Sequence, residues 1–169
     1  MSKRYVYKTR EVSAGAFLKK MSVLHFVFVV GMIVFAIVAY VQNGSTEIDI
    51  SNTNDPYFIA VPSAAIAGIL LSMLIYKNRI NALSNTASLK DKLLRYQTAR
   101  IVKYLLLEVP ILFGLVIYMN TGNMFYLLVS VMVLIYFFTL FPRREKIIKE
   151  LNMDRQQQIL FNKPDQLLN

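Results

Sequence analysis

The chain of 169 residues contains no cysteine and a single histidine. The lack of cysteine excludes disulfides, cysteine-ligated zinc, iron–sulfur clusters and covalently attached haem c. His25 alone cannot supply the two axial ligands of a b-type haem, nor a multi-histidine metal site. We therefore expect no metal and no other cofactor.

Charged residues are also scarce, at 17% of the chain, whereas 56% of the residues are hydrophobic. A soluble globular domain has roughly 25% charged residues. The excess of apolar residues must therefore face lipid. The composition predicts an all-α membrane helical bundle rather than a soluble domain.

The formal net charge of +9 comes from 19 Lys and Arg residues, which fall in three blocks within residues 1–20, 77–103 and 143–169. Long uncharged runs separate these blocks. Such alternation is typical of membrane topology, in which basic segments lie on the cytoplasmic side near anionic lipid headgroups. We therefore expect the lipid bilayer as a partner, and we expect no nucleic acid.

Four apolar runs predict transmembrane helices, and we place them at residues 22–42, 56–76, 101–119 and 124–142. At 1.5 Å per residue, a helix of about twenty residues crosses a hydrocarbon core about 30 Å thick. The first run lacks a good small-x-small cleavage site, so we interpret it as a retained span rather than a signal peptide.

None of the Lys and Arg residues lies in the two intervening segments 43–55 and 120–123. The positive-inside rule then places both termini of a multi-pass membrane protein in the cytoplasm. We expect the membrane to be a bacterial inner membrane. This topology divides the chain into a basic cytoplasmic arm, a four-span membrane domain with a cytoplasmic helical hairpin, and a cytoplasmic amphipathic tail. The corresponding ranges are 1–20, 21–142 with the hairpin at 77–100, and 143–169.

Local signals refine the cytoplasmic segments. Ser88 is expected to cap a helix that continues into the third span. In the tail, Ile147, Ile148 and Leu151 share one helical side, which predicts an amphipathic helix that lies on the membrane surface or against the cytoplasmic hairpin. Asn152 is expected to end that helix and to cap a shorter one.

Small residues at four-residue spacing mark one face of the second span, at Ala60, Ala64, Gly68 and Ser72. In lipid there is no hydrophobic drive between helices, so close van der Waals contact must hold them together. The spacing predicts a packing seam.

Glu108 is the one acid within the predicted spans, and Pro110 follows it closely. An ionised carboxylate in hydrocarbon is costly, so Glu108 should find a partner or keep its proton. His25, Ser72 and Thr139 lie at similar depth in their own spans, which predicts a polar intramembrane cluster. His25, Lys103, Ser72 or a neighbouring subunit are the candidate partners of Glu108, and we expect Pro110 to kink the helix beside it.

The run from Glu108 to Gly114-Leu115-Val116 is similar to the carboxylate-bearing helix of the ATP synthase proteolipid, in which a Glu at this spacing carries the ion. The glycine-rich partner helix of that family is absent here, and four spans are predicted rather than two. We interpret this short similarity as convergence.

A longer pattern over residues 88–169 includes Leu107-Glu108-Val109-Pro110, Thr121-Gly122-Asn123, and Pro142 before Glu145-Lys146-Ile147. It resembles small uncharacterised four-helix membrane proteins of the Bacteroidota. The resemblance implies the four-helix architecture but does not imply any activity.

Without a catalytic constellation, we expect no enzyme. The leading hypothesis is a subunit, accessory or scaffold protein that packs with itself, as a homo-oligomer, or with another membrane protein. The alternative is a small ion- or proton-coupled transporter or channel that uses Glu108.

Overall fold

The computed structural model describes residues 13–51, 54–83 and 87–163, and these parts of the chain fold into α-helices joined by short connections. The helices are α1 (Ala14–Asn43), α2 (Pro56–Asn81), α3 (Leu89–Thr121), α4 (Met124–Phe138), α5 (Arg144–Glu150) and α6 (Arg155–Asn162). Most of the predicted N-terminal arm lies outside the described residues. The all-α class is confirmed.

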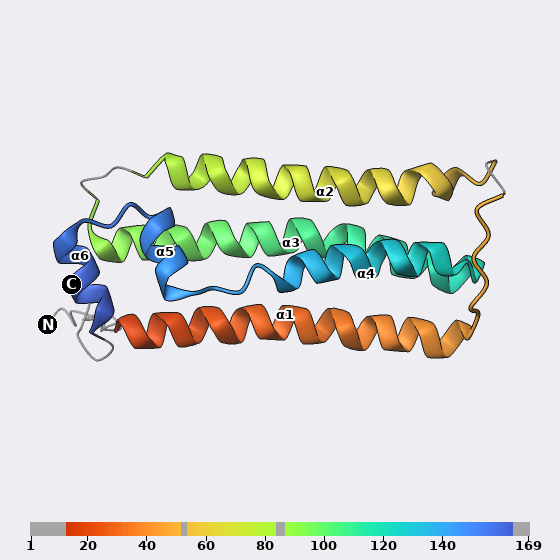
Figure 1. The fold of residues 1–169 in the computed structure, drawn as a ribbon, viewed down its shortest axis with the longest axis horizontal. Coiled ribbons are helices and arrows are strands. Elements are labelled where there is room, and N and C mark those ends of the chain that lie inside the picture. Colours follow the sequence, from red (N-terminus) through yellow and green to blue (C-terminus); the bar gives the residue numbers. More distant parts are fainter. Residues whose placement is uncertain (1–12, 52–53, 84–86, 164–169) are drawn as a thin grey trace, which may run out of the picture.

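The first four helices lie side by side along the long axis of the molecule, and α5 and α6 lie across one end of this bundle (Figure 1). Successive long helices run in opposite directions, so α1 starts at the same end at which α4 finishes. α1, α2 and α3 are long and apolar enough to cross a membrane, whereas α4 is apolar but has only 15 residues. α3 contacts α1, α2 and α4 and forms the centre of the bundle.

Side chains and glycines at the helix ends set most of the boundaries. The Ser88 hydroxyl accepts a hydrogen bond from the backbone N–H of Asp91, which confirms the predicted cap of α3. α3 then continues without a break through Pro110 to Thr121. Gly44 and Gly122 end α1 and α3 with φ angles of 66° and 73°, which a residue without a Cβ adopts at little cost.

Two boundaries differ from the sequence prediction. α4 ends at Phe138 rather than at Pro142, because the proline lacks a backbone donor and its ring disfavours a helix immediately before it. In the tail, the cap of α6 is Asp154, which accepts from the backbone N–H of Gln157. Asn152 instead adopts a φ of 43° in the turn between the two short helices.

The buried apolar side chains form two clusters. The larger fills the space between the four long helices, with Leu107, Ile111, Leu115 and Tyr118 of α3 at its centre. The smaller lies at the end of the bundle covered by α5 and α6, and we call it the end cluster. Its members are Ala14, Phe17, Met21, Tyr76, Ile80, Leu89, Leu93, Tyr96, Ala99, Ile147, Leu151, Met153 and Phe161.

At the opposite end, the segment after α1 is hydrogen-bonded to the α3–α4 turn. The Asn43 side chain donates to the backbone carbonyls of Tyr118 and Met119, at 3.2 and 3.1 Å. The Tyr118 hydroxyl donates to the Ser45 carbonyl at 2.8 Å. The Asn43 side chain thus supplies a donor to the Met119 carbonyl in the last turn of α3, while the Tyr118 carbonyl also accepts from the backbone N–H of Gly122.

Candidate functional site

Arg100 of α3 is the centre of a polar site where the bundle meets α5. Its side chain is 1% exposed, yet each nitrogen of the guanidinium group has an acceptor. Nε donates to the Tyr96 hydroxyl at 2.9 Å, Nη1 to the Leu140 carbonyl at 3.2 Å, and Nη2 to Glu150 Oε2 at 3.2 Å. A buried charge needs such complete hydrogen bonding to offset its desolvation.

Aromatic rings complete this site, which we call the Arg100 site. The guanidinium carbon lies 5.0 Å from the centre of the Tyr76 ring and 5.1 Å from that of Tyr96. Both distances are typical of cation–π interactions. The Tyr76 hydroxyl donates to Glu150 Oε2 at 2.5 Å. One carboxylate at the end of α5 therefore joins α2 and α3.

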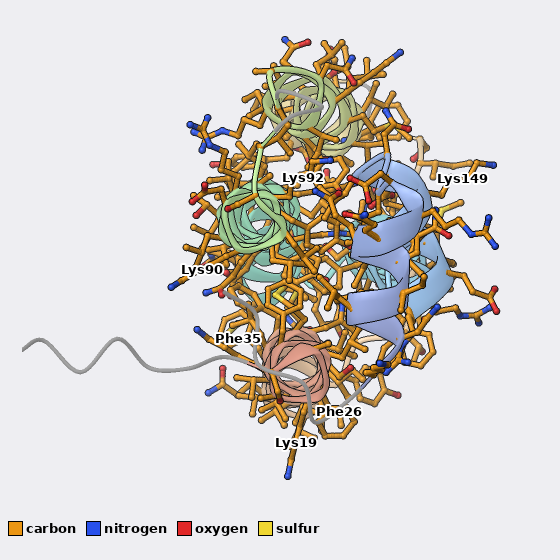
Figure 2. All side chains as sticks on the ribbon, turned by 90° about the vertical axis from the view of Figure 1, so that its left-hand side faces the viewer. Lys19, Phe26, Phe35, Lys90, Lys92 and Lys149 are labelled. Carbon is orange, nitrogen blue, oxygen red and sulfur yellow. The ribbon has the colours of Figure 1, made fainter. Side chains whose placement is uncertain are left out.

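A second buried cation, Lys92, fixes α6 to the start of α3. Lys92 is 1% exposed and donates to the Asn152 carbonyl at 3.4 Å and to Gln157 Oε1 at 3.0 Å. The Gln157 side chain in turn donates to the Ala87 carbonyl at 3.1 Å. Figure 2 views this end of the molecule, where Lys19 and Lys149 point outward while α5 and α6 cover the end of the bundle. Residues 144–162 of the tail are therefore part of the folded body.

Glu108 lies on α3 with its side chain half-buried. Leu107 and Ile111 beside it face the core, whereas Leu105 and Val109 are exposed. Within the described residues, Glu108 has no hydrogen-bond or ion-pair partner. It therefore lies at the border between the packed interior and the outer surface of α3.

His25 does not pair with Glu108. Its ring is 3% exposed and stacks on Phe137, with ring centres 5.3 Å apart and an interplanar angle of 11°. Tyr104 and Phe141 also contact it, with ring centres at 5.3 and 5.6 Å. Its Nδ1 is buried, and no described residue donates to it or accepts from it. Aromatic contacts, rather than an acid, position this histidine.

The other two members of the predicted polar cluster bond to their own helices. The Ser72 hydroxyl donates to the Ile69 carbonyl at 2.8 Å, and the Thr139 hydroxyl donates to the Tyr136 carbonyl at 2.7 Å. Hydroxyls in helices commonly bond back in this way. Among the described residues, no hydrogen bond joins any two of the four residues of the predicted cluster.

The small-residue face of α2 approaches α3 at Gly68. A Cβ built on Gly68 would lie 2.7 Å from Pro110 Cγ, which is closer than real Cβ atoms approach, and 3.1 Å from the Leu106 carbonyl oxygen, which is a tight contact. Ser72 is fully buried on the same face, while Ala60 and Ala64 are partly exposed. Pro110 therefore occupies the space that Gly68 leaves.

Sequence reasoning missed the Arg100 site. The sequence does contain a signal for this site. Tyr96 and Arg100 are four residues apart on one helix, and Glu150 lies in the later amphipathic segment. Packing of the tail against the cytoplasmic hairpin was one of two alternatives, and the sequence does not show which side chains such packing would bring to Arg100. The described residues contain no group of three or more His, Cys, Asp or Glu side chains that could hold a metal ion.

The fold and the site thus define an all-helical chain with three helices able to span a membrane and a tail anchored at one end. Comparison of the chain with protein-family models, with curated proteins and with solved structures finds no match.

Proposed function

We propose that this chain is a non-enzymatic membrane protein that packs with a second copy of itself or with another membrane protein, as a subunit or accessory factor. The observation that carries this proposal is the half-buried carboxylate of Glu108, which lacks a partner among the described residues. A carboxylate in hydrocarbon is costly, so a hydrogen-bond donor from outside the chain would stabilise it.

The surface beside Glu108 suits a neighbouring helix. Leu105 and Val109 are 47% and 67% exposed and form an apolar strip on α3. An apolar strip with one acid at its edge can pack against another membrane helix that carries a donor. Van der Waals contact and an interhelical hydrogen bond are the interactions that drive such association in lipid.

For the membrane placement, we propose four spans with both termini in the cytoplasm of a bacterium. The alternating direction of the four long helices supports this topology (Figure 1). α4 is about 22 Å long at 1.5 Å per residue, shorter than a typical hydrocarbon core. The backbone that follows it is covered in part: Leu140 and Pro142 are buried and Arg100 donates to the Leu140 carbonyl, whereas Thr139 and Phe141 are exposed.

A site-specific crosslinking experiment in cells tests the proposal. A photo-crosslinking amino acid at Val109 is expected to yield a discrete adduct with a second polypeptide, and Glu108→Leu is expected to abolish it. The same amino acid at Met132, which is 70% exposed on α4, is the matched control. Equal labelling from both positions, or an adduct that survives Glu108→Leu, would contradict the proposal.

The second candidate function is an ion- or proton-coupled transporter or channel, and the same unpartnered carboxylate favours it. In this case Glu108 would hold a proton or a cation during transport. Reconstituted vesicles give the test, because Glu108→Gln keeps the shape of the side chain but removes its charge. If every measured proton and cation flux is unchanged in this variant, Glu108 does not couple transport.

A further inference from the structure

A cavity of about 560 Å³ lies between α1 and the junction of α4 with α5, and it is open on one side. Its lining residues are His25, Phe26, Val29, Phe138, Thr139, Phe141, Arg143 and Lys146. A volume of this size is within the range of small-molecule sites. It is separate from the Glu108 surface and from the Arg100 site.

The lining divides into an apolar part and a basic part. The apolar part consists of Phe26 and Val29 on α1, Phe138 at the end of α4, and Phe141 in the segment after it. The basic part comes from the next few residues of the chain: Arg143, which directly precedes α5, and Lys146, in the first turn of α5, both line the cavity. Hydrocarbon and positive charge therefore meet within one cavity.

The positive charge at this rim is not neutralised by the nearest acid along α5. α5 carries two acids: Glu145, beside Lys146, is exposed and forms no ion pair among the described residues, and the carboxylate of Glu150 is already bound by Arg100 and Tyr76. Arg143 and Lys146 line the same cavity, so their like charges repel each other there. An anion at the rim would relieve this repulsion.

The cavity also holds a polar group that the fold does not use. His25 is nine-tenths or more buried and lines the cavity, and its Nδ1 has no hydrogen-bond partner among the described residues. Buried polar atoms are nearly always paired in folded proteins. His25 therefore adds a polar side chain to the apolar wall of the cavity, while its Nδ1 itself is enclosed by neighbouring atoms.

From these observations we infer that the cavity is a specific site for an anionic phospholipid. The phosphate group binds Arg143 and Lys146 at the rim, and the upper part of the acyl chains lies against the phenylalanine side chains. The location agrees with this ligand, because basic side chains at the end of an apolar helix meet the headgroup region of a bilayer. The inference does not depend on a partner for Glu108.

Native mass spectrometry of the purified, delipidated full-length protein tests the site. Dioleoyl phosphatidylglycerol is expected to bind as one tight copy, and dioleoyl phosphatidylcholine to bind far more weakly. The double variant Arg143→Gln with Lys146→Gln is expected to lower the affinity for phosphatidylglycerol about tenfold or more. The double variant Lys77→Gln with Lys149→Gln removes the same charge from exposed positions outside the cavity and is expected to change it little.

A phosphatidylglycerol with a diazirine on its acyl chain locates the hydrocarbon part. It is expected to label residues 26–29 and 138–141 in the wild-type protein and to lose this labelling in the first double variant. Equal weakening by both double variants would show diffuse surface attraction and would overturn the inference. Binding of soluble glycerol phosphate as tight as that of the lipid would indicate a site for free anions and would also overturn the inference. Labelling spread along all exposed helices would overturn it as well.

Discussion

Arg100 and Glu150 form an ion pair, with Nη2 and Oε2 3.2 Å apart, across a sequence separation of fifty residues. The pair joins the central helix of the bundle to the C-terminal tail. Arg100 also donates to the Leu140 carbonyl, in the turn where α4 has already ended. One side chain thus connects the tail to the bundle and satisfies the backbone at the end of α4.

Replacing Arg100 should therefore destabilise the fold. Arg100→Met leaves the Leu140 carbonyl and the partly exposed Glu150 carboxylate without this donor, so we expect a loss of about 2–4 kcal/mol in unfolding free energy. Glu150→Gln keeps an acceptor and should cost less. Thermal unfolding in detergent measures both variants. Lys149→Gln, at an exposed neighbour, is the control, and equal effects of Arg100→Met and Lys149→Gln would contradict the structural role of Arg100.

Lys92 should hold α6 in place. Lys92→Met removes the donor for the Asn152 carbonyl and for Gln157, so we expect the amides of residues 155–162 to exchange faster with deuterium. Lys90→Met, two residues away, makes neither contact and should leave the exchange unchanged. Hydrogen–deuterium exchange followed by mass spectrometry reads both variants. Unchanged protection of α6 in Lys92→Met would show that apolar contacts alone fix the tail.

Close packing of α2 on α3 should depend on Gly68. A Cβ at this position overlaps the Pro110 ring, which is held within a continuous helix, so Gly68→Ala should cost about 1–3 kcal/mol. Gly31 has no atom within 4 Å of a Cβ built on it, and Gly31→Ala is a matched control that should be neutral or stabilising. Unfolding in detergent compares the two. Equal stability of the two variants would mean that α2 does not pack closely at Gly68.

The proposed topology has a direct labelling test, since the chain contains no native cysteine. Single cysteines at Ser51 and Asn120 should react with a membrane-impermeant maleimide in cells whose outer membrane has been permeabilised. Single cysteines at Arg95 and Lys149 should react only after lysis. Labelling of Asn120→Cys and Lys149→Cys from the same side would show that α4 does not cross the membrane.

The sequence predicted best those structural features that depend on residues close together in the chain. Apolar length and the hydroxyl of Ser88 are local signals, and they predicted the helical class and the start of α3. The end of α4 was predicted four residues too late, because hydropathy does not detect the effect of Pro142 on the preceding backbone.

The polar contacts were predicted less well, because they depend on which sides of the helices pack against one another. Depth alone suggested that Glu108 and His25 could pair, but the ring of His25 packs among aromatic side chains and Glu108 lies toward the outer surface of α3. The Arg100 site required knowledge that Glu150 returns to the bundle. No spacing within either segment shows that contact.

The most direct test of the central proposal is the mass of the complex that the protein forms in a membrane. Native mass spectrometry from nanodiscs, after extraction without added crosslinker, should detect the chain bound to a second copy or to another membrane protein. Glu108→Leu should return it to a monomer with unchanged thermal stability, because Glu108 has no hydrogen-bond or ion-pair partner among the described residues. A strict monomer for the wild-type chain, with no partner captured at Val109 in cells, would contradict the proposal.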